Sequence, residues 1–222
     1  MPTDFVKTYD IQIVNESNDS QRFLLFQDLP APSNLDQEDV FTNVFQRSKR
    51  IPSGPQSAVG FTLKQEYFAI YGDAKKNADG TVRVYTKNST PAKLGPQGSA
   101  TFITTFEKNV EEPDPSFSKL YIGCGAEDPN SDGSIIPVQT WIAKPGVSTQ
   151  IFPHATYYIC TGEYQPGMVV DRSTIGSALK IDFTGSSLSS VTFTYGSDGA
   201  YTAVDEDEVR KANIKFETTD FQ

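Results

Sequence analysis

Histidine is nearly absent from this chain, which has one imidazole, His154, in 222 residues. Zinc, copper and non-haem iron sites of the multi-histidine type need two or three imidazoles. The single histidine therefore excludes cupin-like metal centres and the H-E-x-x-H motif of metalloproteases. Any acid–base catalysis by an imidazole has to use His154.

Signatures of nucleotide binding and of serine hydrolases are missing as well. The sequence has no P-loop and no G-x-S-x-G elbow. Its G-C-G run at Gly123 and Gly125 continues as Ala-Glu-Asp, which departs from the dinucleotide-binding fingerprint. We expect no organic cofactor, and calcium is the one cofactor that a motif of the chain suggests.

Basic residues are outnumbered, with 19 Lys and Arg against 28 Asp and Glu and a formal net charge of -9. Nucleic-acid binding depends on neutralising phosphates with Lys and Arg, so we expect neither nucleic acid nor an anionic membrane as a partner. No apolar run approaches the ~18–20 residues of a membrane span. Residues 1–10 show no basic segment followed by an apolar one, so no secretory signal is visible and we expect a cytoplasmic protein.

Cysteine is scarce too, and two thiols are too few for a disulfide framework. Cys124 and Cys160 lie in the strand-like runs YIGCG and YYICTG. We interpret them as buried thiols that act as small apolar side chains. Two alternatives stay open: neighbouring strands could bring the thiols together, or Cys124 could be a nucleophile if the fold places it beside His154.

What the sequence does contain is a succession of short β-rich runs separated by Gly, Pro, Asn, Asp and Ser. Such runs predict an all-β fold, an antiparallel β-sandwich that is jelly-roll-like or a flattened barrel, with little helix. The length suits a single domain covering residues 1–222. The strands are expected at residues 9–14, 22–27, 40–45, 58–63, 67–71, 81–86, 101–106, 119–123, 138–143, 156–161 and 179–183.

The strongest local signal is the run from Val191 to Val204, where Asp-Gly separates two alternating segments and predicts a hairpin. Helical signals are confined to residues 35–40 and to residues 205–212, where carboxylates precede basic residues as a helix dipole favours. Residues 214–217 are expected to return as an edge strand. Residues 48–56 and 109–117 are expected to be loops.

The segment from Asp128 to Gly133 matches the D-x-N-x-D-G opening of a calcium loop, with Asp128, Asn130 and Asp132 as ligands. The match fails at the twelfth position, where Gln139 replaces the expected glutamate. The same residues are typical of a plain surface turn. Both a calcium site and a turn therefore remain open.

Residues 152–171, FPHATYYICTGEYQPGMVVD, concentrate polar and aromatic side chains. His154 is a candidate acid or base, with Tyr158, Tyr164 and Asp171 as assisting catalytic residues. Candidate ligand-binding residues are Tyr157, Glu163 and the single tryptophan, Trp141. On a strand, Tyr158 and Cys160 would face one way and Tyr157 and Ile159 the other. The alternative is that these aromatic residues pack the core.

Several segments carry a resemblance to a known family: VNESNDSQRFLLFQ and DVFTNVF near the start, then YIGCG, QTWIAKPG, residues 152–171 and ALKIDF. In this order they resemble the RhiA-like (rhizosphere-expressed) proteins, small bacterial and fungal β-proteins. Residues 126–133 and the acidic residues 205–208 depart from that pattern. The resemblance implies a β-sandwich and assigns no catalytic residue.

Three functions fit these observations. The first is a β-sandwich that binds a small molecule or a glycan. The second is a cofactor-free enzyme of the cyclase or isomerase type, which uses His154 on a hydrophobic small-molecule intermediate of a biosynthetic pathway. The third is a calcium-dependent binding module.

Overall fold

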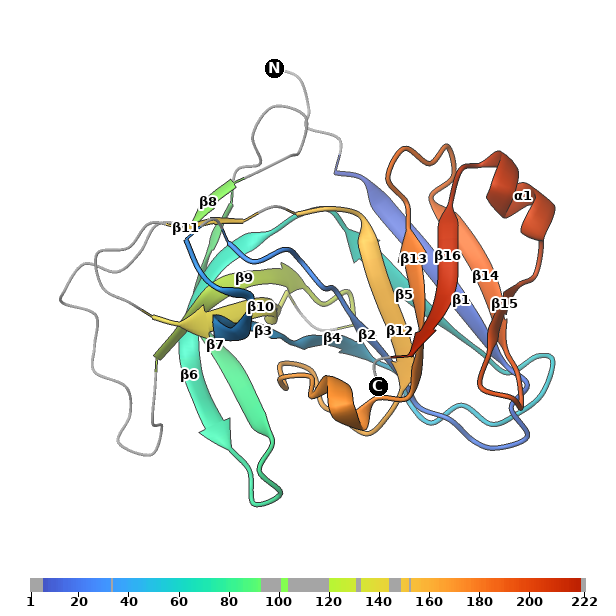
Figure 1. The fold of residues 1–222 in the computed structure, drawn as a ribbon, viewed down its shortest axis with the longest axis horizontal. Coiled ribbons are helices and arrows are strands. Elements are labelled where there is room, and N and C mark those ends of the chain that lie inside the picture. Colours follow the sequence, from blue (N-terminus) through green and yellow to red (C-terminus); the bar gives the residue numbers. More distant parts are fainter. Residues whose placement is uncertain are drawn as a thin grey trace.

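The computed structural model describes residues 6–32, 34–92, 101–103, 120–130, 133–143, 149–151 and 153–220. Strands dominate it, and they form sheets in two layers with a third sheet beside them (Figure 1). Each sheet in the described part is open, with two edge strands. The all-β, sandwich-like class that the sequence predicts is confirmed.

The first layer is a four-stranded sheet in the order β15-β14-β1-β5. Its strands are β1 (Thr8–Asn15), β5 (Ala58–Lys64), β14 (Ser190–Tyr195) and β15 (Tyr201–Ala203). Side chains alternate along β1, with Tyr9, Ile11 and Ile13 buried, as a sheet with one covered face requires. The predicted hairpin of β14 and β15 is confirmed. The sequence did not indicate that β1 pairs with β14 in parallel, because the two strands come from opposite ends of the chain.

The second layer is a five-stranded antiparallel sheet in the order β16-β13-β12-β2-β4. It contains β2 (Phe23–Phe26), β4 (Val44–Arg47), β12 (Thr156–Thr161), β13 (Ser177–Asp182) and β16 (Lys215–Asp220). Every residue of β2 is buried, because the first layer covers one face and residues 162–176 cover the other. We call residues 162–176 the strap. The predicted edge strand near the C-terminus is β16.

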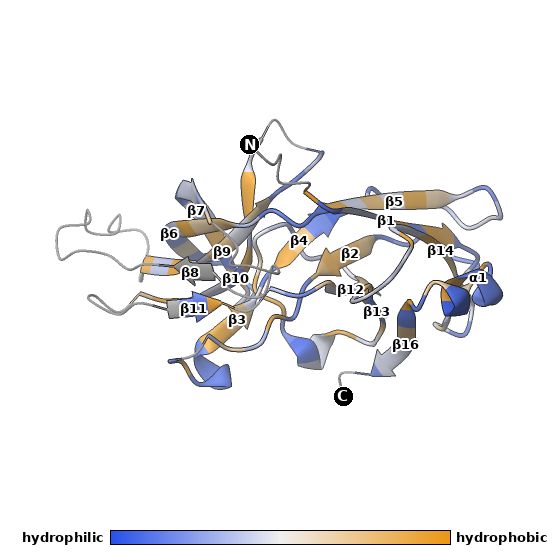
Figure 2. Cartoon of the chain, turned by 90° about the horizontal axis from the view of Figure 1, so that it is seen from above, coloured by the Kyte–Doolittle hydropathy of each residue, from blue (hydrophilic) through white to orange (hydrophobic). Residues whose placement is uncertain are grey.

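A third sheet, in the order β3-β10-β9-β6-β7, continues the structure beside the two layers (Figure 2). Its strands are β3 (Val40–Thr42), β6 (Phe68–Lys76), β7 (Val82–Pro91), β9 (Leu120–Glu127) and β10 (Ile135–Ile142). Strand β8 (Thr101–Ile103) pairs with β11 (Thr149–Ile151) in a small separate sheet. The run predicted as one strand over residues 40–45 is divided at Asn43, so that the chain leaves the third sheet as β3 and enters the second layer as β4.

Among the described residues, helix is limited to α1 (Glu206–Lys211) and to the 3-10 turns η1 (Gln37–Asp39) and η3 (Arg172–Thr174). The helical signal over residues 205–212 is confirmed by α1, and the Asp205 side chain caps this helix by accepting a hydrogen bond from Glu208 N at 2.8 Å. The helical turn expected at residues 35–40 is η1. None of these helices has the length and hydropathy needed to cross a membrane.

One continuous cluster of buried side chains includes residues of all three large sheets. Aromatic rings join the layers: Tyr9 packs 4.5 Å from Phe183 and 6.0 Å from Tyr157, measured between ring centroids. Trp141 of the third sheet belongs to the same cluster. A smaller cluster fills the space between the second layer and the strap, and includes Tyr158 and Cys160.

Candidate functional site

A groove of about 480 Å³ lies where strand β3, turn η1 and the end of the strap meet. We call it the Asp28 groove. Its lining combines apolar side chains, which we call its floor, with charged and hydrogen-bonding groups. The lining residues are Asp28, Leu29, Pro30, Gln37, Val40, Phe41, Thr42, Val169, Val170 and Arg172.

The apolar floor is held by contacts on both of its sides. Phe41 packs against Tyr121 of β9 with ring centroids 5.9 Å apart. Val170 belongs to the buried cluster under the strap, and its backbone N donates to the Thr42 carbonyl at 2.8 Å. The strap and β3 are therefore joined along the groove, and the floor is fixed before any ligand arrives.

The polar side of the groove centres on an ion pair between the Asp28 carboxylate and the Arg172 guanidinium. The Thr42 hydroxyl lies 3.3 Å from the same Asp28 oxygen. The Asp28 and Arg172 side chains are 22% and 42% exposed, so the pair faces solvent. It offers an acceptor and donors side by side to a molecule resting on the apolar floor.

Two predicted catalytic residues, Asp171 and Tyr164, make hydrogen bonds within the strap and do not line the groove. Asp171 Oδ1 accepts from the backbone N of Ser173 at 3.0 Å and from its hydroxyl at 2.7 Å, which caps the turn η3. The Tyr164 hydroxyl lies 2.5 Å from Thr174 Oγ1 at the end of the same turn. Both side chains fix η3 and thereby the position of Arg172.

Tyr158 lies close to the groove on the outer face of the second layer. Its ring stacks on Phe26, with centroids 5.4 Å apart. Burial raises its pKa, Lys180 lowers it and Asp28 raises it again. The phenol is therefore protonated at neutral pH. The predicted alternation is confirmed, because Tyr158 and Cys160 face the strap whereas Tyr157 and Ile159 face the main core.

His154 precedes β12 and is half-buried. Its backbone carbonyl accepts a hydrogen bond from Gln27 Nε2 at 2.5 Å. Burial lowers the pKa of the imidazole, and the carboxylates of Asp182 and Asp28 oppose this shift. Within the described ranges, Nδ1 is buried without a hydrogen-bond partner. His154 is thus a neutral imidazole near Asp28, outside the residues that line the groove.

The two aromatic ligand-binding candidates lie in the core. Trp141 and Tyr157 are each 2% exposed, so neither presents a surface to solvent. Burial raises the pKa of Tyr157 well above its ordinary value. In the same buried cluster, the hydroxyl of Tyr67 donates to Gln27 Oε1 at 3.0 Å. These residues stabilise the interior that supports the groove.

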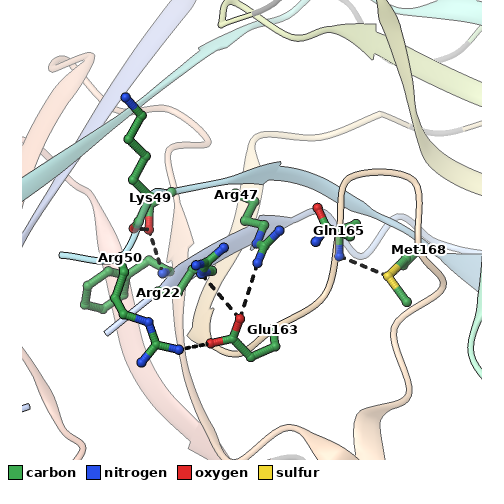
Figure 3. A network of polar contacts seen from close by, with 9 residues as sticks. Arg22, Arg47, Lys49, Arg50, Glu163, Gln165 and Met168 are labelled. Atoms are coloured by element: carbon green, nitrogen blue, oxygen red, sulfur yellow. Dashed lines mark hydrogen bonds and ion pairs between the residues drawn. The ribbon is translucent and has the colours of Figure 1, made fainter. Parts of the chain in front are cut away.

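The third ligand-binding candidate, Glu163, lies at the start of the strap, away from the strap residues that line the Asp28 groove. It meets three arginines, Arg22, Arg47 and Arg50, whose guanidinium nitrogens lie 3.4, 3.3 and 2.5 Å from its carboxylate oxygens (Figure 3). We call these four residues the arginine cluster. Sequence reasoning selected Glu163 but not the arginines, which come from other segments.

At the predicted calcium loop, Asp128 Oδ1 accepts from the backbone N of Asn130 at 2.9 Å and lies 3.3 Å from its side-chain Nδ2. Asp132 lies outside the described residues. Across the described ranges, no group of three or more His, Cys, Asp or Glu is arranged to hold a metal ion. The calcium site stays a prediction.

Both cysteines are free and buried. Cys124 belongs to the main core and Cys160 to the cluster under the strap. Burial raises the pKa of each thiol to about 12, so both are protonated at neutral pH. The interpretation as buried thiols is confirmed, and the disulfide is not formed.

Asp28, Thr42 and Arg172 were not singled out from the sequence. They lie in three separate segments, and only the tertiary fold brings them together. One local signal was present at Arg172, since Asp171-Arg172-Ser173 has the pattern of a side-chain-capped turn. That pattern indicates a structural role for Asp171 and would have directed attention to the residue that the turn presents.

Comparison with known proteins identifies the family. No curated protein and no solved structure matches this chain. A family model described as RhiA matches residues 6–206, a range that contains the Asp28 groove and the arginine cluster. The chain belongs to the RhiA family, in agreement with the resemblance seen in its sequence.

Proposed function

We propose that this protein binds a small molecule in the Asp28 groove. The observation that carries the proposal is the groove of about 480 Å³, with its apolar floor and the exposed Asp28–Arg172 pair. Small-molecule sites are preformed concavities of about 300–1,000 Å³, mostly apolar, with a few polar groups that fix orientation. The groove has this size, and its lining combines apolar side chains with the polar groups of Asp28, Thr42 and Arg172.

The groups in the groove favour a ligand with an apolar body and at least one hydroxyl. Asp28 accepts hydrogen bonds, Arg172 donates them, and Thr42 can do both. The apolar body would rest on Phe41, Val169 and Val170. A glycan is the less favoured ligand, because Phe41 is the only aromatic residue among the described residues that line the groove.

A ligand screen with groove variants tests this proposal. Mixtures of hydroxylated apolar small molecules and a set of oligosaccharides are screened by saturation-transfer NMR, and hits are titrated. Phe41→Ala removes part of the floor, and Thr42→Val keeps the shape but removes a hydroxyl. We expect Thr42→Val to weaken a hit by up to about tenfold, since a neutral hydrogen bond contributes about 0.5–1.5 kcal/mol.

Thr192→Val is the matched control. Thr192 is also a strand threonine whose hydroxyl meets one side chain, Gln12 at 3.3 Å, but it lies in the first layer on β14. Ligands should bind this variant as they bind the parent protein. The proposal fails if no compound binds, or if every hit binds Phe41→Ala and Thr42→Val as tightly as the control.

A second candidate is the cofactor-free enzyme. It is favoured by the neutral state of His154, whose pKa burial lowers, and by the electrostatic interaction of its imidazole with the Asp28 carboxylate of the groove. A neutral imidazole can accept a proton from a substrate that extends from the groove to His154. A confirmed groove ligand would be followed by NMR for conversion. Turnover that survives His154→Gln unchanged would exclude His154 as the base.

A further inference from the structure

The arginine cluster concentrates positive charge in an acidic protein. The chain has six arginines and a net charge of -9, yet three of its arginines meet at one carboxylate. Arg22 precedes β2, Arg47 ends β4, Arg50 follows β4, and Glu163 follows β12. Three positive charges face one negative charge, so a local excess of two positive charges remains.

Two of the guanidinium groups are largely buried, whereas the carboxylate is not. The side chains of Arg47 and Arg22 are 14% and 23% exposed, and that of Glu163 is 61% exposed. Burial lowers the pKa of Arg47, and the charge of Arg22 lowers it further. A second anion would relieve this repulsion, since Glu163 alone does not balance the three arginines.

The arginine cluster contains N–H groups that could donate hydrogen bonds to a bound anion. Nε of Arg22 and Nε of Arg47 are buried and have no hydrogen-bond partner within the residues that the structure describes. Arg22 Nε lies 3.4 Å from the Glu163 carboxylate, but without the alignment of a hydrogen bond. Unsatisfied donors on a buried cation are costly, so they favour an acceptor beyond those that the described residues supply.

The backbone holds the two buried arginines in place. The Arg22 carbonyl accepts from Gly162 N at 3.0 Å, and Arg47 pairs with Leu24 across the sheet. Ser48, next to Arg47, accepts from Phe23 N at 2.8 Å through its hydroxyl. Lys49 points away from the cluster (Figure 3). The site is therefore built from fixed strand ends, with Glu163 as its exposed member.

We propose that Arg22, Arg47 and Arg50 bind the phosphate group of a small phosphorylated molecule, and that Glu163 occupies the site in the absence of phosphate. A phosphate monoester carries about -1.5 to -2 charges at pH 7, which matches the excess of two positive charges. Guanidinium groups bind phosphate oxygens in pairs of parallel hydrogen bonds. The site is separate from the Asp28 groove and does not depend on a ligand there.

The test is a titration of the protein with sodium phosphate and with glycerol 2-phosphate, followed through the arginine Nε–H signals in NMR. Sodium acetate and sodium chloride at equal ionic strength are the reference salts. We expect dissociation constants of about a millimolar or below for both phosphates. Binding of inorganic phosphate without glycerol 2-phosphate would overturn the assignment to a phosphorylated molecule.

Two substitutions and one control decide whether the cluster is the site. Arg50→Ala, at the most exposed arginine of the cluster, should weaken phosphate binding about tenfold. Glu163→Gln removes the competing carboxylate and should strengthen it by about fivefold or more. Arg210→Ala removes an exposed arginine that pairs with Asp207 on α1, and should leave binding unchanged.

Two outcomes would overturn the proposal. Chloride could shift the same signals as phosphate at equal ionic strength, which would indicate screening rather than binding. Alternatively, Glu163→Gln could lower the melting temperature without raising the affinity for phosphate, which would assign Glu163 a purely structural role. Neither outcome bears on the Asp28 groove, because phosphate is not the probe used there.

Discussion

Asn43 is the buried residue through which three segments are joined. Its Nδ2 donates to the Gly167 carbonyl of the strap at 3.0 Å, and its Oδ1 accepts from the Thr140 hydroxyl of β10 at 2.9 Å. It also divides β3 from β4 and is fully buried. The amide therefore holds the strap, which supplies Val169 and Val170 to the Asp28 groove, against the third sheet.

Replacing Asn43 by Ala should destabilise the protein by about 2–4 kcal/mol, because two buried partners lose their hydrogen bonds. Urea unfolding of the variant measures the loss. Asn88→Ala is the control, since the Asn88 side chain is exposed and its one contact of this kind within the described ranges is the hydrogen bond that it accepts from its neighbour Ser89 N. That control should stay within about 0.5 kcal/mol of the parent. Equal effects of the two substitutions would contradict the role assigned to Asn43.

His154 should make the stability of the protein depend on pH. Its pKa is lowered in the folded state, so the unfolded chain binds the proton more readily. Unfolding free energy therefore rises with pH below the unfolded value of about 6.5, and this contribution is complete above it. On acidification from pH 7 to pH 5, the parent should lose more stability than His154→Gln.

The measurement is urea unfolding of the parent and of His154→Gln at a series of pH values. Carboxylates titrate in both proteins, so their contributions cancel in the difference and the histidine remains. A difference that does not change between pH 5 and pH 7 would mean that the folded state leaves the imidazole unperturbed.

At the scale of elements, the bulge of β6 against β7 depends on a glycine. A Cβ built on Gly72 would lie 1.8 Å from the Tyr85 carbonyl oxygen of the paired strand. The ladder shifts register between Tyr71 and Gly72, which brings the two backbones this close. Gly60 on β5 is a strand glycine with nothing within 4 Å of the corresponding position.

Gly72→Ala should therefore cost more than about 2 kcal/mol, because the added methyl displaces a backbone. Gly60→Ala should be neutral or stabilise by up to about 1 kcal/mol, since alanine loses less backbone entropy in a strand. Chemical denaturation of both variants makes the comparison. A Gly72→Ala protein as stable as Gly60→Ala would show that the β6–β7 bulge does not need glycine.

The loop after β9 gives a prediction for calcium. If Asp128, Asn130 and Asp132 bind the ion, millimolar calcium raises the melting temperature and a chelator lowers it, because the ion binds only the folded state. Asp128→Ala should remove the effect of calcium. Magnesium at the same concentration is the control for ionic strength. If neither calcium nor chelator changed the melting temperature, the calcium site would be excluded and these residues would form a plain turn.

The elements were largely predictable from the sequence, whereas the site was not. Alternation in β1 and the Asp-Gly turn between β14 and β15 are local signals, and they indicated the elements that the structure contains. The parallel pairing of β1 with β14 is a long-range contact that leaves no local trace. The same holds for Asp28 with Arg172 and for the arginine cluster, whose members lie far apart in the sequence.

At the scale of the whole molecule, the continuous core suggests that the three large sheets unfold together. Trp141 is the single tryptophan and lies buried in the third sheet, so its fluorescence reports on that sheet. Phe193 lies in β14 of the first layer, fully buried in the same cluster. If residues 1–222 form one domain, these two distant places belong to one cooperative transition.

Phe193→Leu should therefore lower the midpoint of the Trp141 fluorescence transition as much as that of far-ultraviolet circular dichroism, by about 1–2 kcal/mol of unfolding free energy. In the parent, the two probes should give superimposable urea curves. The control is Val204→Ala, an exposed residue at 63% that follows β15 and should leave both midpoints in place. A fluorescence midpoint that stays fixed while circular dichroism shows an earlier step would indicate that the third sheet unfolds separately from the sandwich. The prediction of a single domain would then be wrong.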